Sequence, residues 1–322
     1  MKLNSISEYI DGIKSRNIAV LSKAITLIES KKKEHQEQAA ILIEQVLPLS
    51  GNSIRIGITG VPGVGKSTFI DEFGLNLISK GKKIAVLAID PSSSLSKGSI
   101  LGDKTRMDRL SVHGNAYIRP TASGGSLGGI TYKTKETIML CEAAGFDYIL
   151  VETVGVGQSE TEVSGITDFF LLLMLAGAGD ELQGIKRGIM EMADGIVITK
   201  ADGNNLSKAT MAKAEFSNAL HFFPPASSGW TPLVKTCSSI EKKGFEEIIN
   251  MIESYQLHTV SNGFFQAKRD EQNLIAFQKL LDEQIRQRFF SSEKMLEQIN
   301  ELRTKVQKGL ISPYGAVKSI IN

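Results

Sequence analysis

Gly60-Val-Pro-Gly-Val-Gly-Lys-Ser-Thr68 is the most informative stretch of this 322-residue sequence. Its G-x-x-x-x-G-K-[ST] spacing is that of a phosphate-binding P-loop. Residues 54–59 before it form an apolar run typical of a buried strand, and residues 67–80 after it place apolar side chains at helical spacing. In such a strand–loop–helix unit, glycines allow backbone N–H groups and the helix N-terminus to face negative charge. The pattern therefore predicts a nucleoside triphosphate site; the alternative is a glycine-rich turn that holds nothing.

Each residue of this loop is expected to contact the nucleotide. The Lys66 side chain should reach the β- and γ-phosphates, and the Ser67 hydroxyl is a suitable ligand for Mg²⁺. Lys66 is also predicted to be catalytic. The predicted phosphate-binding residues are Gly60, Val61, Pro62, Gly63, Val64, Gly65, Lys66, Ser67 and Thr68.

Composition and charge narrow the class of protein. The chain is 42% hydrophobic and 22% charged, which is typical of a soluble globular protein. Its net charge of +2 gives no case for nucleic acid or an anionic membrane as the main partner. Cys141 and Cys237 lie far apart, which favours reduced cysteines over a disulfide or a metal site. The longest apolar run, residues 169–178, is about half as long as a membrane span requires, and the first residues lack a signal-peptide profile. We expect a cytoplasmic protein.

Apolar strands that alternate with helical segments predict an α/β fold with a doubly wound, mostly parallel sheet. Ligands bind such a sheet at the carboxyl ends of its strands. The predicted strands are residues 54–59, 83–90, 117–120, 147–153, 169–175, 195–202 and 233–239.

Amphipathic helices are expected on both sides of this nucleotide domain, which we place at residues 51–258. Apolar residues at helical spacing predict an N-terminal helical extension over residues 1–50. Residues 259–322 predict a C-terminal helical arm with apolar faces that need a cover. The arm either packs on its own domain or contacts a second copy of the chain.

Carboxylates follow the predicted strands where a metal–phosphate site would lie. Asp90 ends one strand, and Asp103 follows it across a polar, glycine-containing segment. A hard cation prefers oxygen ligands and keeps waters that nearby carboxylates hold. Glu152 ends another strand three residues before Gly155, which suits a carboxylate holding a metal-bound water and an N–H contacting the γ-phosphate. The alternatives are a helix cap for Asp90, a surface charge for Asp103 and a solvent-facing charge for Glu152.

Thr199-Lys-Ala-Asp202 resembles the guanine-recognition motif Asn-Lys-x-Asp with its first residue replaced. The Asp202 carboxylate can accept from guanine N1–H and from the exocyclic amine, and adenine offers no such pair of donors. Lys200 is expected to pack over the base. Thr199 lacks the amide that ties this loop to the base and the P-loop, which predicts weaker base affinity. The backbone N–H groups of Cys237 and Ser238, at the end of the last strand, are candidates for contacting guanine O6.

Together these motifs resemble the MeaB/ArgK family over nearly the whole chain. The family comprises P-loop GTPases of the signal-recognition-particle/MinD-like class that act as chaperones for adenosylcobalamin-dependent methylmalonyl-CoA mutase. The matching segments besides the P-loop are Ala24–Ser30, Asp90-Pro-Ser-Ser, Gly102–Met107, Val151–Gln158, Gly179–Lys186 and the Ser312-Pro-Tyr tail.

The resemblance implies further roles for the residues already named. It implies Mg²⁺-GTP on the P-loop, with Asp90, Asp103 and Glu152 around the metal. It implies switch segments near residues 92–107, 154–164 and 178–188. In the third switch, Gln183 and Lys186 would couple the nucleotide state to the mutase. The C-terminal helices would be a dimerisation arm, which favours a homodimer.

The leading hypothesis is a homodimeric GTPase that binds GTP, GDP and Mg²⁺ and gates adenosylcobalamin loading or protection of the mutase. The main alternative is an ATP-dependent kinase or ATPase linked to lysine–arginine–ornithine transport, an older label of this family, against which Asp202 argues. A nickel-inserting GTPase of the same superfamily would need a His- or Cys-rich metal store, which the sequence lacks.

Overall fold

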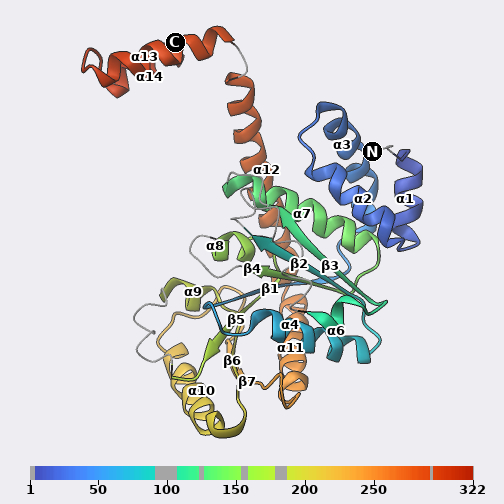
Figure 1. Cartoon of the computed structure of the whole chain (residues 1–322). Coiled ribbons are helices and arrows are strands. Elements are labelled where there is room, and N and C mark those ends of the chain that lie inside the picture. The colour runs from blue at the N-terminus through green and yellow to red at the C-terminus, as the bar shows by residue number, and fades with distance from the viewer. Residues whose placement is uncertain are drawn as a thin grey trace. The chain divides into compact units, whose positions relative to one another are not determined.

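The structure is a computed structural model that describes residues 4–90, 107–122, 127–153, 159–177, 187–290 and 293–321. For residues 90, 121, 122, 127–131, 159, 187, 287, 293 and 294 it describes only the backbone. Its centre is a seven-stranded sheet in the order β3-β2-β4-β1-β5-β6-β7 (Figure 1). Every neighbouring pair is parallel, so the predicted mostly parallel sheet is confirmed as all-parallel. The strands are β1 (Ile54–Gly60), β2 (Ile84–Asp90), β3 (Ala116–Ala122), β4 (Tyr148–Thr153), β5 (Phe169–Leu175), β6 (Gly195–Thr199) and β7 (Leu233–Thr236).

Helices connect the strands and extend the chain at both ends. The sequence did not predict α10, which follows the base-recognition motif. Within the described residues the helices are α1 (Ile6–Lys14), α2 (Ile18–Glu29), α3 (Lys33–Val46), α4 (Lys66–Ser79), α6 (Asp108–Ser111), α7 (Leu127–Ala143), α8 (Ser159–Ser164), α9 (Arg187–Met192), α10 (Leu206–Leu220), α11 (Phe245–Ser261), α12 (Phe264–Phe289), α13 (Glu293–Gln307) and α14 (Pro313–Ile321), with short 3-10 turns at Leu47–Leu49 and Gly203–Asn205.

The sheet buries both faces, as a parallel sheet with crossover helices must. Alternate residues of β1, such as Ile56, pack with Phe69 and Phe73 of α4 and with α11. On the other face, β2 and β4 pack with α7 and with the N-terminal helices α1 to α3. The predicted helical extension therefore shares a core with the sheet, because one set of its apolar side chains, including Leu21 and Leu42, is fully buried there.

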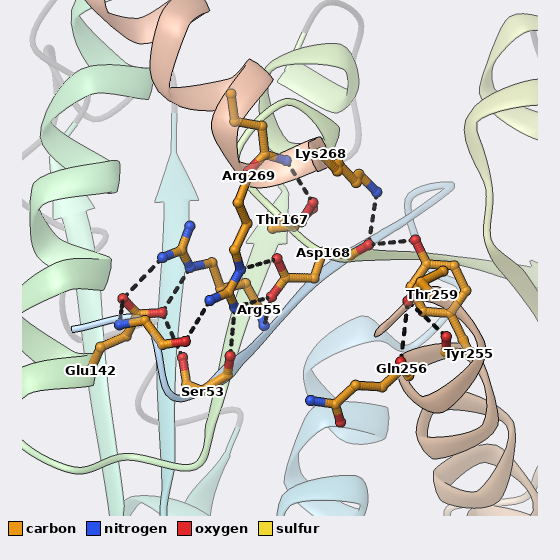
Figure 2. Close-up of polar contacts among 12 residues, drawn as sticks. Ser53, Arg55, Glu142, Thr167, Asp168, Tyr255, Gln256, Thr259, Lys268 and Arg269 are labelled. Carbon is orange, nitrogen blue, oxygen red and sulfur yellow. Dashed lines mark hydrogen bonds and ion pairs between the residues drawn. The ribbon is translucent and has the colours of Figure 1, made fainter. Parts of the chain in front are cut away.

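Buried charges gather at the opposite edge of the sheet from the P-loop, where β1 begins. Arg55 of β1 donates to both carboxylate oxygens of Glu142 in α7, at 2.8 and 3.0 Å. Arg269 of α12 donates to both oxygens of Asp168, at 2.8 and 2.7 Å, and two further N–H groups donate to the carbonyls of Gly51 and Ser53. Figure 2 shows the two pairs beside each other. We call these residues, Ser53, Arg55, Glu142, Asp168 and Arg269, the basal charge network.

The chain divides into two compact units, Met1–Gln272 and Asn273–Asn322. The second unit holds the end of α12 together with α13 and α14, the segment predicted to form an arm. It exposes many large apolar side chains, among them Leu274, Phe277 and Ile285, of which 69%, 62% and 58% are accessible. The predicted domain boundaries stay a prediction.

Candidate nucleotide-binding site

The P-loop joins β1 to α4 at the carboxyl edge of the sheet. Gly63 and Gly65 have φ angles of 79° and 92°, which glycine adopts without the strain that a side chain would cause. At Gly60, an added Cβ would lie 2.5 Å from the Leu173 carbonyl oxygen. Among the described residues, no side chain caps the start of α4. The first N–H groups of this 14-residue helix are therefore available to an anion.

Lys66 lies buried in this loop. Its Nζ donates to the Gly60 carbonyl at 2.7 Å and to the Val61 carbonyl at 3.4 Å. Burial lowers the pKa of Lys66, and the charges of Glu152 and Glu160 act in the opposite direction. Two carboxylates therefore lie within electrostatic reach of the P-loop lysine.

Ser67 and Glu152 are in contact. The Ser67 hydroxyl donates to Glu152 Oε1 at 3.1 Å, which joins the predicted metal ligand to the predicted water-holding carboxylate. Glu152 is 8% exposed, so the alternative of a solvent-facing charge at the end of β4 is wrong.

The sequence analysis did not single out Glu160, which it covered only as part of the switch segment near residues 154–164. The side chain is 5% exposed, and its buried Oε2 has no hydrogen-bond partner among the residues that the structure describes. An unsatisfied buried carboxylate oxygen is costly and calls for a donor such as an ordered water. An acidic residue shortly after a strand-end carboxylate was the one available signal.

The base-recognition motif contacts the P-loop directly. Thr199, at the end of β6, donates its hydroxyl to the Val64 carbonyl at 2.8 Å, and Met174 O lies 3.2 Å away. Lys200 Nζ donates to the Gly63 carbonyl at 2.9 Å. The expectation that Thr199 leaves this loop untied from the P-loop is therefore wrong, because a hydroxyl makes the connection without an amide.

Asp202 is held by the end of β7. The Ser238 hydroxyl donates to Asp202 Oδ2 at 2.6 Å, and the Glu241 N–H donates to the same hydroxyl oxygen. Burial, with Asp202 nearby, raises the pKa of the Cys237 thiol to about 12, so this cysteine is a neutral packing group.

The predicted contact between guanine O6 and the N–H groups of Cys237 and Ser238 does not fit the structure. The Cys237 N–H donates to the Ile198 carbonyl, and the Ser238 N–H donates to the Lys243 carbonyl. Both donors are committed within the protein. The next residue, Ser239, has no partner for its N–H in the part of the chain that the structure describes.

Several predicted residues lie outside the described part of the chain. These are Asp103, Gly155, Gln183 and Lys186. The Asp90 backbone ends β2 at the carboxyl edge of the sheet, as predicted, and the structure adds that β2 pairs with β4.

A glycine-rich loop between a central parallel strand and an uncapped helix, with a buried lysine and a serine–carboxylate pair, defines a P-loop nucleoside triphosphatase. The chain belongs to the MeaB family: the model described as "Methylmalonyl Co-A mutase-associated GTPase MeaB" matches residues 21–294. It is a GTPase of this family.

Individual relatives agree over nearly the full length. A "Probable GTPase" of Mycobacterium tuberculosis is 46% identical over 97% of this chain and 94% of its own length. The "GTPase ArgK" of Escherichia coli is 42% identical over 98% and 96%, respectively. The solved structure of a "LAO/AO transport system kinase" superposes with a TM-score of 0.79 at 35% identity, covering 99% of this chain and 98% of that one.

As a GTPase, the chain binds GTP and GDP, typically with Mg²⁺. The residues present fit these groups. The start of α4, which no described side chain caps, suits phosphates, and the buried Glu160 oxygen, which no described residue contacts by a hydrogen bond, suits a donor such as a metal-bound water. Among the described helices, none has the length and apolar character needed to cross a membrane.

Proposed function

We propose that this GTPase is a homodimeric, cytoplasmic chaperone that gates adenosylcobalamin loading or protection of a methylmalonyl-CoA mutase. The family description names that mutase as the associated enzyme. The observation that carries the nucleotide part is the direct connection of the base-recognition motif to the P-loop through Thr199 and Lys200.

Within the proposed site, the phosphates lie on residues 60–68 and the base lies against residues 199–202. Lys66 leaves the carbonyls of its own loop and donates to the β- and γ-phosphates, where it stabilises the charge of the transferred group. Asp202, oriented by Ser238, accepts from guanine N1–H and the exocyclic amine, and the Ser239 N–H donates to O6.

The metal part of the site uses oxygen ligands. Ser67 would hold Mg²⁺ directly, and Asp90, Asp103, Glu152 and Glu160 would hold it or its waters. When bound, Mg²⁺ neutralises phosphate charge and orders the oxygens for in-line attack. The Ser67 hydroxyl donates to Glu152, so the side chains of these two proposed ligands are adjacent.

The switch segments are proposed to carry the nucleotide state to the mutase. They lie near residues 92–107, 154–164 and 178–188, with Gly155 contacting the γ-phosphate and Gln183 and Lys186 coupling to the partner. Loss of the γ-phosphate would release these segments and change their contact with the mutase.

The homodimer is proposed to form through the C-terminal unit. Ile285, Phe289 and Val317 lie among the residues that line an apolar groove of about 490 Å³ within residues 273–322. Exposed apolar faces of this extent typically mark a protein–protein contact. A second copy presents an equivalent apolar face, as a two-fold contact requires.

An ATP-dependent kinase linked to lysine–arginine–ornithine transport is the alternative function, because the related solved structure is titled a transport system kinase. Asp202 argues against it. Its carboxylate, held by Ser238 at 2.6 Å, would face an adenine edge without paired donors.

Nucleotide turnover with and without the mutase tests the proposal. Purified protein with Mg²⁺ is expected to hydrolyse GTP slowly, and an adenosylcobalamin-dependent methylmalonyl-CoA mutase is expected to bind it and raise the rate. If the mutase neither binds the protein nor changes its rate of GTP hydrolysis, the chaperone role is contradicted. The GTPase activity would stand in that case. Transfer of phosphate from ATP to a protein acceptor would favour the kinase.

A further inference from the structure

Glu160 is a buried carboxylate that the fold itself does not fully pair. It lies in the first turn of α8 and is 5% exposed, and its buried Oε2 has no hydrogen-bond partner among the residues that the structure describes. A buried carboxylate oxygen without a donor is destabilising, because it has lost its contact with water and has no replacement. Such a group calls for a donor that the protein chain does not supply.

The packing of α8 places Glu160 toward the P-loop. One turn further along the helix, Val163 packs on β1 at Gly57, where an added Cβ would lie 2.8 Å from Val163 Cγ1. A helix that connects parallel strands runs back toward their amino ends, so the turn before Val163 lies nearer the carboxyl edge of the sheet. Burial lowers the pKa of Lys66, and the charge of Glu160 is among those that oppose this change. The two side chains therefore lie within electrostatic reach of one another.

Glu152 and Glu160 differ in their partners. Glu152 accepts from the hydroxyl of Ser67, the proposed Mg²⁺ ligand, at 3.1 Å. Among the described residues, no such contact joins Glu160 to a proposed metal ligand. A carboxylate beside a phosphate cannot accept from it, because neither anion has a proton to donate. A water between them can donate one hydrogen bond to each.

We propose that Glu160 is a further catalytic residue, which accepts a hydrogen bond from the water that attacks the γ-phosphate and so orients that water. In this step, a bond forms between the water oxygen and the γ-phosphorus. The bond from that phosphorus to the bridging oxygen breaks, and its electron pair leaves with GDP. Both water protons finish on the released phosphate, so Glu160 supplies orientation and is not consumed. This inference rests on the proposed position of the phosphates on residues 60–68.

The same carboxylate should lower the stability of the nucleotide-free protein. Glu160→Gln keeps the shape of the side chain and removes its charge, so the urea midpoint of unfolding without nucleotide should rise by roughly 0.5 M. Glu72→Gln is the matched control. Glu72 is 4% exposed and pairs with Arg109 at 2.7 Å, so loss of its charge should lower the midpoint instead.

The rate of GTP hydrolysis should change in the opposite sense. In single-turnover assays with Mg²⁺, full-length Glu160→Gln should hydrolyse GTP roughly 10²-fold more slowly than wild type, because the attacking water is no longer oriented by a carboxylate. The affinity for guanosine 5′-(β,γ-imido)triphosphate, and the Mg²⁺ concentration that this binding requires, should stay within about twofold of wild type. Glu247→Gln, at an exposed position of α11, should hydrolyse GTP at the wild-type rate.

Three results would overturn the inference. The first is GTP hydrolysis at the wild-type rate in Glu160→Gln. The second is a higher Mg²⁺ requirement in that variant, which would assign Glu160 to the metal. The third is a urea midpoint at or below that of wild type, which would mean that the carboxylate is already satisfied. Failure of the proposed phosphate position is distinguishable, because Lys66→Met would then bind the imido analogue as tightly as wild type.

Discussion

The two ends of strand β1 carry buried polar groups in different states of pairing. At its start, Arg55 and Glu142 satisfy one another through two hydrogen bonds, and Asp168 receives two more from Arg269. At its end, Lys66 rests on backbone carbonyls of its own loop. The charged groups of the two ion pairs already have their partners within the protein and do not need a ligand. The Lys66 ammonium bonds only to neutral carbonyls among the described contacts, and it can exchange these hydrogen bonds for hydrogen bonds to phosphates.

This difference indicates that the charged groups at one end of β1 stabilise the fold, whereas Lys66 at the other end serves ligand binding. Breaking a buried, fully paired charge leaves its partner charged and unsolvated, so the cost falls on folding. Changing a group whose best partner is a ligand costs binding and catalysis instead. The basal charge network and the P-loop edge should therefore respond to substitution through different measurements.

The largest expected effect is on folding. Arg269→Met leaves Asp168 without its bidentate partner at 1% side-chain exposure and should lower the free energy of unfolding by about 3–5 kcal/mol. Urea denaturation monitored by circular dichroism measures this change. The folded fraction should bind GDP as wild type does. A large loss of GDP affinity at unchanged stability would contradict the separation between the stabilising role of the basal charge network and the binding role of the P-loop edge.

The next effect is on turnover. Lys66→Met should lower kcat/KM for GTP by roughly 10²–10³-fold, because the transition-state charge loses the ammonium that is proposed to stabilise it. The unfolding midpoint should stay near that of wild type. Lys80→Met, at the end of the same helix, is the matched control because Lys80 bonds to Glu246 at the surface. If kcat/KM fell equally in the two variants, the effect would come from the loss of a positive charge and not from the position of Lys66 in the P-loop.

Asp202→Asn should change which base is bound. The amide can donate to the 2-carbonyl of xanthine but cannot accept both guanine donors, so the preference for GDP over XDP should fall by about 10²-fold. Competition binding experiments with GDP, XDP and ADP measure the relative affinities for the three nucleotides. A variant that still prefers GDP as strongly as wild type would exclude Asp202 from base recognition.

The smallest expected effect is a pH dependence of the free energy of unfolding, which comes from Lys135 near the basal charge network. Burial lowers the pKa of Lys135 to about 8, with the Arg55 charge acting in the same direction and Glu142 opposing it. Between about pH 8 and the ordinary value of 10.5, the unfolded chain holds a proton that the folded chain has released, so stability rises with pH.

Lys135→Met removes this contribution to the pH dependence of the free energy of unfolding. The stability of wild type relative to Lys135→Met should increase by roughly 1 kcal/mol between pH 8 and pH 10. Parallel curves for the two proteins over this range would show that Lys135 keeps its proton.

Local motifs explain what the sequence could predict. The P-loop, the strand before it and Asp202 were identifiable because their residues act at fixed short spacing. The mostly parallel sheet was predictable because apolar strands alternate with helical segments, whereas the order of the strands comes from the structure alone. The basal charge network was not predictable, since Arg55 and Glu142 are 87 positions apart, and Asp168 and Arg269 are 101 positions apart. Nothing local marks such partners before the fold brings them together.

The same limit applied inside the site. Thr199 departed from the motif, and only the structure shows that its hydroxyl reaches the P-loop. The N–H groups of Cys237 and Ser238 were assigned to guanine because sequence cannot show that the strand and a turn already use them. The roles of Asp103, Gly155, Gln183 and Lys186 stay predictions.

One measurement tests the central claim that the carboxyl edge of this sheet is a guanine-nucleotide site. Dissociation constants for GDP and ADP are determined with Mg²⁺ on wild type, Lys66→Met and Arg269→Met. The account predicts a strong preference for GDP in wild type and in folded Arg269→Met, and weak binding in Lys66→Met. Equal affinity for GDP and ADP in wild type, or GDP binding that survives Lys66→Met, would contradict it.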